Sequence, residues 1–357
     1  MLNPSLSSSR IGGESIQQTL LAKELVRSGY DVSMVVIDHG QPDGEVIEGI
    51  KVFKTYRPDA GLPGLRFFHP RATAVFKALH KADADIYYQS CAGVLTGYVA
   101  RHCKKHDRKF VFRVASDADC MPGQQLLEFW RDKKIYEYGL KRADLILAQS
   151  QKQVSLLESN YGLKSVCMNM AVEIPTGSAD SARNIDALWV SNIRPLKRPE
   201  IVFELANRLP QHSFVIIGGP TRDPRYFREI QKEAESIGNI RFMGPVPYKD
   251  MEQYFATAKT FINTSVIEGF PNTFLQSWIH GVPVVSFFDP DNLIADKNLG
   301  YSPPGVEEMA GMIDDLISDE EKRSAVSRHV AQFALEHYSP EAVVKEHVRV
   351  FTECFSS

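Results

Sequence analysis

The chain has 357 residues, of which 43% are hydrophobic and 24% charged, and its net charge is −3. This length suits two domains of roughly 150–200 residues each, and the composition excludes a disordered chain, collagen, a coiled coil and a small disulfide scaffold. No apolar run approaches the roughly 18–20 residues needed to span a bilayer, the first ten residues lack a secretory apolar core, and the five cysteines form no CxxC pair. These features predict a cytoplasmic protein with reduced thiols.

In the first half, short β-rich runs alternate with amphipathic helical stretches. The clearest helix is predicted over Glu14–Ser28, where Ile16, Leu20 and Leu25 share one face and Gly29 is the stop signal. Further helices are expected near residues 92–103 and 126–140. The predicted strands of this half cover residues 32–37, 52–56, 86–90, 110–115, 145–148 and 166–170.

A second alternating series begins at Ala187. Its predicted strands cover residues 188–191, 214–217, 240–243, 261–263 and 284–286, and its predicted helices lie near residues 199–209, 226–237, 249–256 and 272–280. Strands that alternate with helices predict two α/β domains with doubly wound parallel sheets. Ligands of such folds bind at the carboxyl ends of the strands, so the expected site is a central cleft between the domains.

The segment 173–184 has the composition of a linker and places the domain boundary near residue 180. The sequence therefore predicts an N-terminal domain over 1–180 and a C-terminal domain over 181–338. A helical tail over 339–357 follows the break at Ser339-Pro340.

Charge is unevenly distributed. Residues 1–172 contain 23 Lys and Arg against 18 Asp and Glu, whereas residues 173–357 contain 18 against 26. Basic residues gather in segment 101–109 and between Arg66 and Lys81, beside Phe67 and Phe68. This pattern is typical of a surface that contacts anionic lipid, or of a solvated helix face. The excess charge is small and no nucleic-acid motif accompanies it, so no nucleic-acid partner is expected.

Two glycine pairs stand beside predicted elements. Gly12-Gly13 opens the first helix, where free amides bind anions and glycine permits close backbone approach, although a simple turn would also explain it. Gly218-Gly219 ends the second strand of the second half and indicates either close approach to a ligand or a sharp turn.

A cationic loop follows the first strand of the second half. Arg194, Lys197 and Arg198 are expected at the carboxyl edge of the sheet, where they would neutralise a pyrophosphate. The alternative is a solvated loop with a proline in the first helical turn.

The segment from Glu268 to Gln276 is the most specific signal. Glu268 would accept hydrogen bonds from sugar hydroxyls, and the free amides that follow would point at a hydroxyl- or phosphate-rich ligand. The residues of this segment that are expected to bind the donor are Gly269, Phe270, Pro271, Asn272 and Gln276. A capped helix without a ligand is the alternative.

Together these motifs resemble the group 1 (family 4) retaining glycosyltransferases, which have the GT-B fold of two facing Rossmann-like domains. The resemblance covers nearly the whole chain. It implies that the loop at Gly12 and Gly13 contacts the donor and that Lys197 binds the donor diphosphate. Asn192 or Arg194 would replace the family's partner arginine.

The resemblance also assigns the second half of the site. Glu268 matches the first glutamate of the family's E-x7-E motif, which contacts the donor sugar. Val246 lies in the loop 243–247, which resembles the loop whose backbone contacts the nucleotide base, and Gly219 is expected nearby. The final helix of this family crosses back onto the first domain, which suits residues 341–351.

Three departures from the family pattern are visible. Gln276 replaces the second glutamate of E-x7-E, and its amide oxygen can still accept from ribose hydroxyls. The histidine that many relatives place near the donor sugar is missing, and Asp117 is the candidate there for contact with the acceptor or donor sugar, although an ordinary strand-end turn is the alternative. The first strand of the N-terminal domain is predicted to be missing, because residues 1–11 hold no apolar run.

The resemblance implies transfer of a sugar from a nucleotide-diphosphate donor to a hydroxyl of a glycan or lipid-linked acceptor, with retention, in cell-surface polysaccharide or lipid-linked glycan synthesis. The residues expected to act in catalysis are Glu268, Lys197, Arg194 and Asp117. No cofactor and no metal are expected, because the cationic loop serves the diphosphate that a D-x-D metal site would otherwise bind. The alternatives are a nucleotide-sugar epimerase on the same fold and a non-catalytic binding subunit.

Overall fold

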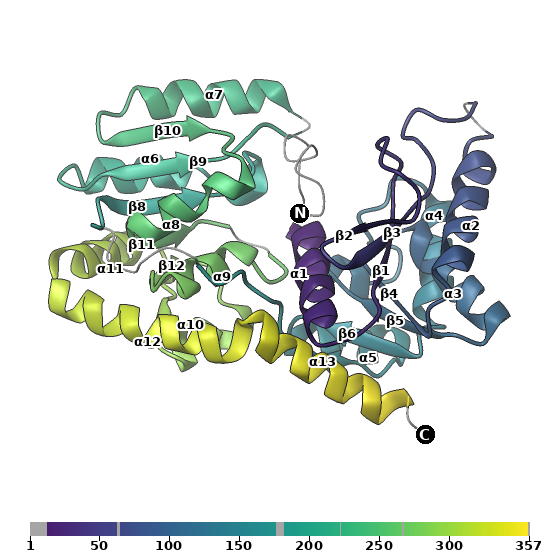
Figure 1. Cartoon of the computed structure of the whole chain (residues 1–357). Helices are drawn as coiled ribbons and strands as arrows, with labels where there is room; N and C mark the ends of the chain where they lie inside the picture. Colours follow the sequence, from purple (N-terminus) through teal and green to yellow (C-terminus); the bar gives the residue numbers. More distant parts are fainter. Residues whose placement is uncertain (1–12, 63–64, 176–181, 222, 266–267, 356–357) are drawn as a thin grey trace. The chain divides into compact units, whose positions relative to one another are not determined.

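The computed structural model describes residues 13–62, 65–175, 182–221, 223–265 and 268–355 (Figure 1). The described residues form two compact units. The N-terminal unit contains residues 13–170 and 340–355, and the C-terminal unit contains residues 171–339. The division follows Met170, ten residues before the boundary expected from the linker composition. Within the described residues, no helix is both long and apolar enough to cross a membrane.

The C-terminal unit is built on one continuous sheet with the strand order β10-β9-β8-β11-β12-β13. All of its strand pairs are parallel. The strands are β8 (Ile185–Val190), β9 (Phe214–Ile217), β10 (Ile240–Gly244), β11 (Ala258–Asn263), β12 (Val284–Ser286) and β13 (Gly300–Tyr301). This is the doubly wound order in which the winding direction reverses between the first and fourth strands, here β8 and β11.

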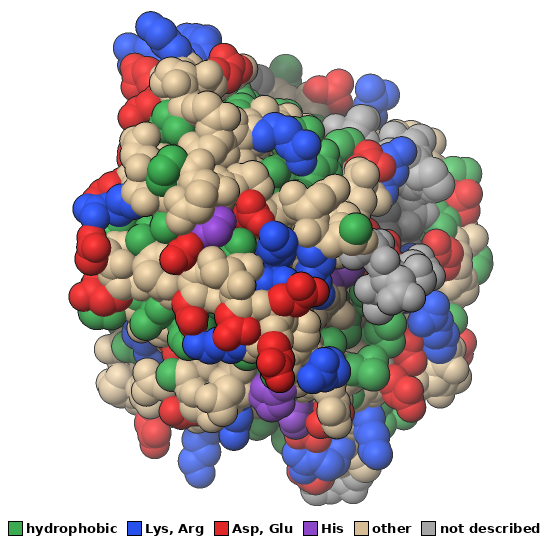
Figure 2. All heavy atoms as spheres, turned by 90° about the vertical axis from the view of Figure 1, so that its left-hand side faces the viewer, with side chains coloured by type: hydrophobic (Ala, Val, Ile, Leu, Met, Phe, Trp, Pro, Cys, Tyr) green, Lys and Arg blue, Asp and Glu red, His purple; other side chains and the backbone are tan. Residues whose placement is uncertain are grey.

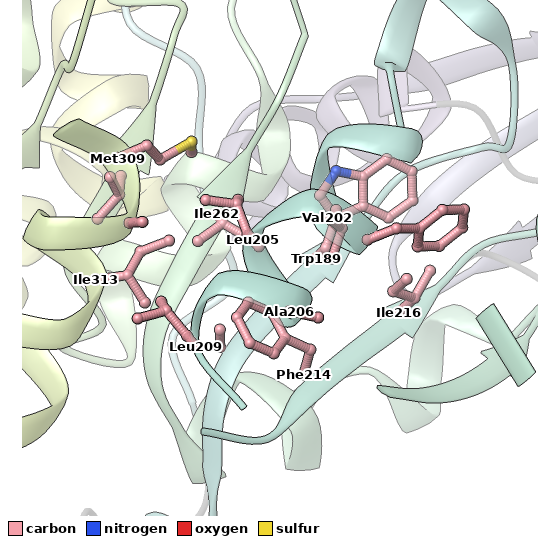
Figure 3. Packing of buried hydrophobic residues seen from close by; sticks show 14 of the residues in the cluster. Trp189, Val202, Leu205, Ala206, Leu209, Phe214, Ile216, Ile262, Met309 and Ile313 are labelled. Atoms are coloured by element: carbon pink, nitrogen blue, oxygen red, sulfur yellow. The ribbon is translucent and has the colours of Figure 1, made fainter. Parts of the chain in front are cut away.

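Helices cover both faces of this sheet. They are α6 (Glu200–Arg208), α7 (Pro224–Glu235), α8 (Glu252–Thr257), α9 (Asn272–Ile279), α10 (Leu293–Asp296), α11 (Val306–Ser318) and α12 (Glu320–Tyr338). Ile262 of β11 lies in the core that α6 and α11 close, together with Trp189 and Met309 (Figure 3). The next residue toward the start of that strand, Phe261, packs on the opposite face against Phe274 of α9. Both neighbours are buried, because a parallel sheet with helices on both faces leaves neither face to solvent.

The N-terminal unit contains two sheets rather than one. The first has the order β1-β3-β2, in which β1 (Ser33–Val36) pairs parallel with β3 (Ile50–Lys54) and β2 (Glu45–Ile47) pairs antiparallel with β3. The second is fully parallel, with the order β4-β5-β6-β7. Its strands are β4 (Ile86–Ser90), β5 (Lys109–Arg113), β6 (Leu145–Ala148) and β7 (Val166–Cys167). Among the described residues no strand precedes β1 or joins the two sheets.

The helices of the N-terminal unit are α1 (Gly13–Arg27), α2 (Thr73–Ala82), α3 (Val94–His106), α4 (Trp130–Leu140), α5 (Gln151–Tyr161) and α13 (Pro340–Phe355). Phe110 and Phe112 of β5 face a core shared with α2, α3 and α4. Val111, between them, faces the other side and packs in a cluster with Val350 of α13. The last helix of the chain thus completes a core of the N-terminal unit.

Several elements differ from the sequence prediction. Helix α1 ends at Arg27, and Gly29 beyond it has a positive φ of 88°, as its stop role requires. The helices α2, α5 and α11 and the β2–β3 hairpin were not predicted, and α4 begins at Trp130 rather than near 126. The hairpin turns through Glu48 and Gly49, both with positive φ, the combination that a tight two-residue turn needs.

Candidate active site

The candidate site lies where two neighbouring strands of the C-terminal unit end. The cationic loop follows β8, and the loop that carries Glu268 follows β11. These two strands are parallel neighbours, and the strand order reverses between them. Their loops therefore begin side by side at the same edge of the sheet. Open α/β sheets bind ligands at such a switch point.

At this edge the Nζ atom of Lys197 forms an ion pair with Oε1 of Glu268. Lys197 is only 7% exposed, and the Glu268 side chain is 13% exposed. Burial lowers the pKa of Lys197, while the neighbouring carboxylate of Glu268 opposes that effect. The pairing compensates two charges that would otherwise be costly to withdraw from water.

Buried hydrogen bonds fix the position of Lys197. The Thr264 hydroxyl donates to the Lys197 carbonyl oxygen over 2.6 Å, and the Trp189 indole N–H donates to the Thr264 hydroxyl over 3.0 Å. Trp189 belongs to β8 and Thr264 directly follows β11. The two strands that supply the ion pair therefore also hold its lysine in place.

Two further predicted residues surround this pair. Arg194, which precedes the short 3-10 turn Pro195–Lys197, is exposed, and its charge contributes to the lowered pKa of Lys197. Asn192 is exposed in the same loop. The next basic residue, Arg198, has a positive φ of 49° and its guanidinium lies 5.6 Å from the centre of the Phe287 ring. Of the three loop cations, Lys197 is the buried one.

The glycine pair after β9 is constrained by its neighbours. A Cβ on Gly218 would lie 1.9 Å from the Ser191 carbonyl oxygen, so only glycine allows the loops after β8 and β9 to approach so closely. A Cβ on Gly219 would lie 3.1 Å from Cβ of Pro245, and the carbonyl of Gly219 accepts from the Ile193 amide over 3.0 Å. The strict steric requirement thus lies at Gly218, and contact of Gly219 with the donor stays a prediction.

Helix α9 begins at Asn272, directly after the Glu268 loop. Gly269 and Phe270 are half-buried, and the buried Pro271 stands at the N-cap without a side-chain cap. Pro271 cannot cap the helix with its side chain, and the Phe274 amide donates to the Pro271 carbonyl oxygen over 3.0 Å.

The side chain of Gln276, one turn further along α9, lies near the hydroxyl of Tyr248 and acts to lower its pKa, against the larger effect of burial. Burial raises the pKa of Tyr248 to about 12. Tyr248 follows β10 and the half-buried Val246, so the loop after β10 and helix α9 meet through this pair.

In the N-terminal unit, Gly12 lies outside the described residues and Gly13 is the first residue of α1. Asp117 forms an ion pair of 2.7 Å with Lys152 and accepts from the side-chain amide of Gln153 over 3.3 Å. Asp119 is buried, which raises its pKa, and it accepts from the backbone amides of Ala115 and Ser116. The two aspartates thus have separate partners. Within the described residues, no three His, Cys, Asp or Glu side chains are grouped as a metal site would require.

The sequence prediction missed the groups that support the site. Thr264 and Trp189 hold Lys197, and Tyr248 lies near Gln276, but none of these belongs to a recognisable motif. One signal was available for Trp189, since a tryptophan inside a buried strand needs an acceptor for its indole N–H.

Comparison with known proteins identifies the family. A family described as "Glycosyltransferase Family 4" matches residues 11–169, and one described as "Glycosyl transferases group 1" matches residues 185–319. O-antigen chain mannosyltransferase B of Escherichia coli is 25% identical over 41% of this chain and 40% of its own length. D-inositol 3-phosphate glycosyltransferase of Kribbella flavida is 23% identical over 56% of this chain and 54% of its own length. The chain thus spans about two fifths to one half of these curated relatives.

Solved structures share the fold at low identity. Sucrose-phosphate synthase of Thermosynechococcus elongatus matches with a TM-score of 0.76 and 17% identity, over 97% of this chain and 94% of its own. A glycosyltransferase of Rickettsia africae matches with a TM-score of 0.73 and 14% identity, over 98% and 97%. Taken with the two family matches, which cover both units, these likenesses show that the chain belongs to the group 1, family 4 glycosyltransferases and has the GT-B fold.

Proposed function

We propose that this protein transfers a sugar from a nucleotide-diphosphate donor to a hydroxyl group of a glycan or lipid-linked acceptor, with retention at the anomeric carbon. The observation that carries the proposal is the buried ion pair between Lys197 and Glu268 at the switch point of the C-terminal sheet. Without a ligand, each side chain neutralises the other. A diphosphate would take the place of Glu268 beside Lys197, and the released carboxylate would accept hydrogen bonds from the donor sugar.

Charge development on the leaving diphosphate is the step these cations would assist. Thr264 fixes the main chain of Lys197 through its carbonyl oxygen, which would keep the lysine side chain at the end of the sheet as negative charge grows on the leaving group. Arg194 is close enough to act on Lys197 electrostatically and would add a second cation. In the proposed reaction the leaving phosphate accepts the proton of the acceptor hydroxyl while the sugar is transferred to that oxygen. Asp117 is proposed to contact the acceptor or donor sugar.

The reaction is proposed to need no metal ion. Lys197 and Arg194 would supply the positive charge that a divalent cation supplies elsewhere. Asp117 and Asp119, which have the spacing of a metal-binding pair, are engaged with Lys152 and with backbone amides respectively. Both features support a metal-independent transferase.

The proposed biological role is supported by the curated relatives and by exposed apolar side chains of the N-terminal unit. The relatives include an O-antigen chain mannosyltransferase, which supports a role in cell-surface polysaccharide or lipid-linked glycan synthesis. Exposed Leu62, Leu65 and Phe68 in the N-terminal unit support peripheral contact with the cytoplasmic face of an anionic membrane.

The test is a binding and turnover panel on the full chain. Thermal-shift measurements with nucleoside diphosphates should show stabilisation by one nucleotide class, since a ligand that binds only the folded state raises its melting temperature. With the matching nucleotide sugar and an acceptor, nucleoside diphosphate should be released, and NMR of the product should show the donor's anomeric configuration.

Each alternative has its own outcome in this panel. Conversion of the donor without an acceptor would favour an epimerase, and binding without turnover would favour a non-catalytic subunit. Treatment with EDTA should leave turnover unchanged. Loss of turnover that added Mn²⁺ restores would overturn the metal-independent mechanism.

A further inference from the structure

An open basin of about 560 Å³ lies between α2 and α3 of the N-terminal unit. Helix α2 contributes Phe76, Lys77 and His80, and helix α3 contributes Arg101, His102, Lys105 and His106. Residues three and four positions apart share one helix face, which places Phe76 and Lys77 beside His80 on α2. The same spacing places Arg101 and His102 beside Lys105 and His106 on α3. The volume falls in the range of small-molecule sites.

The basin collects cations that lack a counter-charge. Among the described residues, no carboxylate forms an ion pair with Lys77, Arg101 or Lys105. Basic residues just outside the basin do have acidic partners. Lys81 pairs with Asp43 at 2.5 Å, and Arg108 pairs with Asp83 at 2.8 Å. Three like charges around one concavity repel each other unless an anion joins them.

Basic and acidic side chains are mixed on one face of the C-terminal unit. On the face shown in Figure 2, Lys and Arg side chains are interspersed with Asp and Glu. Within the C-terminal unit, Arg208 pairs with Glu204 at 2.9 Å, and Lys322 pairs with Asp315. What distinguishes the basin is that three cations without an ion pair among the described residues, Lys77, Arg101 and Lys105, line one concavity.

The floor of the basin supplies imidazole rings. His102 and His106 have ring centres 4.5 Å apart, and those of His80 and His106 are 5.5 Å apart. The Tyr87 hydroxyl donates its proton to the Leu79 carbonyl over 2.8 Å. The same hydroxyl lies 3.2 Å from Nε2 of His102, and because its proton is already used, it accepts there from the imidazole N–H. Burial, with smaller contributions from neighbouring basic groups, lowers the pKa of His102 to about 4, so its ring is neutral at pH 7.

One wall of the basin continues into an aromatic row. Phe76 lies 5.3 Å from Tyr98, Tyr98 lies 6.2 Å from Phe67, and Phe67 lies 5.1 Å from Phe68, all between ring centres. Phe68 is 66% exposed. An apolar path thus runs from the cationic basin to an exposed aromatic side chain.

We propose that the basin between α2 and α3 binds a phosphate group carried by a small organic head group. The charge of Lys77, Arg101 and Lys105 matches a phosphate, and the volume leaves room for the glycerol or sugar to which that phosphate is attached. The phosphate belongs either to an anionic phospholipid, whose chains would meet the aromatic row, or to a soluble phosphorylated molecule, which would use the basin alone. The basin belongs to the N-terminal unit, whereas the proposed donor site belongs to the C-terminal unit.

Two probes test the site on the full chain. Glycerol 3-phosphate binding is measured by calorimetry, and vesicle binding by flotation with phosphatidylcholine vesicles that contain either no or about 30 mol% phosphatidylglycerol. The basin variant is Lys77→Gln/Arg101→Gln/Lys105→Gln. The matched control, Lys51→Gln/Lys104→Gln/Lys164→Gln, removes the same charge from exposed positions of the same unit that do not line the basin.

The wild type should bind glycerol 3-phosphate, the basin variant should bind it about tenfold or more weakly, and the control should match the wild type. A variant that keeps the charge, Lys77→Arg/Lys105→Arg, should retain binding and shows that the loss is not a folding defect. If vesicles that contain phosphatidylglycerol also bind, and Phe68→Ser weakens only that binding, the phosphate is a lipid's. If glycerol 3-phosphate alone binds, the source is soluble.

Two results would overturn the proposal. One is equal weakening in the basin variant and the control, which would indicate a response to net charge. The other is a wild type that binds neither probe. Neither result depends on donor turnover, so the glycosyltransferase proposal would stand or fall separately.

Discussion

The two units differ in the continuity of their sheets. In the C-terminal unit, β8 pairs with both β9 and β11 and makes one sheet of six strands. In the N-terminal unit the described strands form two sheets, in which β1 and β4 are edge strands, and no described strand pairs with both. Every residue of β1 is half-buried, whereas β11 is buried along almost its whole length.

This difference shows what the central strand contributes. In the C-terminal unit β8 carries Trp189, whose hydrogen bond through Thr264 holds Lys197, and it leads directly into the cationic loop. The candidate donor site is thus a product of the continuous sheet. The N-terminal unit contributes instead a basic surface, whose cations lie on helices rather than at strand ends.

The largest expected effect comes from the buried ion pair of the continuous sheet. Lys197→Met should lower transfer on the order of 10³-fold or more, because the leaving diphosphate loses a held cation. It should also destabilise the protein by about 3–5 kcal/mol, because Glu268 is left unpaired. The double variant Lys197→Met/Glu268→Gln should recover stability but not activity, as measured by steady-state kinetics and urea unfolding.

The control for this prediction is Lys259→Met, which removes a less buried ion pair with Asp186 from the same unit. It should keep its kcat. A double variant that regained activity together with stability would show that the pair has only a structural role.

The next largest effect is expected on stability, at the point where the loops after β8 and β9 approach each other closely. Gly218→Ala places a Cβ 1.9 Å from the Ser191 oxygen, so one loop must move. We expect a loss of about 3 kcal/mol in the free energy of unfolding and weaker nucleotide binding. Gly238→Ala, in the same unit with no atom within 4 Å of the new Cβ, is the control and should change neither. Equal melting temperatures for the two variants would contradict the tight packing at this edge.

Hydrogen exchange measures the difference between the sheets directly. Amides of β1 and β4 should exchange faster than those of β8 and β11, because each of the first two strands pairs on one side only among the described residues. Mass spectrometry of peptides from each strand would report the rates. Protection of β1 and β4 equal to that of β8 would mean that another segment pairs with them.

Acidification should lower the stability of the protein by a smaller amount, chiefly through two histidines of the N-terminal unit. The pKa of buried His102 and of buried His347 is lowered to about 4, in both cases chiefly by burial. Between about pH 6.5 and 4 the unfolded chain binds protons that these folded groups do not, so stability falls as the pH falls through this window and is constant above it.

The melting temperature should therefore drop between pH 7.5 and pH 5, and less so in His102→Gln/His347→Gln. The exposed His39→Gln serves as the control and should follow the wild type. An unchanged pH dependence in the double variant would show that other groups cause the loss. His280 of the C-terminal unit, whose pKa is also lowered by burial, contributes in the same direction.

Local signals made much of the fold predictable. The strand at residues 214–217 matches β9, and α9 begins at the predicted Asn272. Other local signals were present but not used. Ser150 caps α5 by accepting from the Gln153 amide over 3.2 Å, and Gly162 ends that helix with a φ of 65°. Both are ordinary helix boundaries.

The sequence by itself determined the alternation of strands and helices, the glycine-bearing loops and the chemical type of the site residues, because these depend on neighbours within a few positions. It could not determine that Lys197 and Glu268, 71 residues apart, neutralise each other, or that Thr264 holds the lysine. Strand order brings those residues together, and strand order follows from which apolar faces pack together across the whole unit. For the same reason only the tertiary structure showed that the N-terminal sheet is divided and that the cations of α2 and α3 surround one basin.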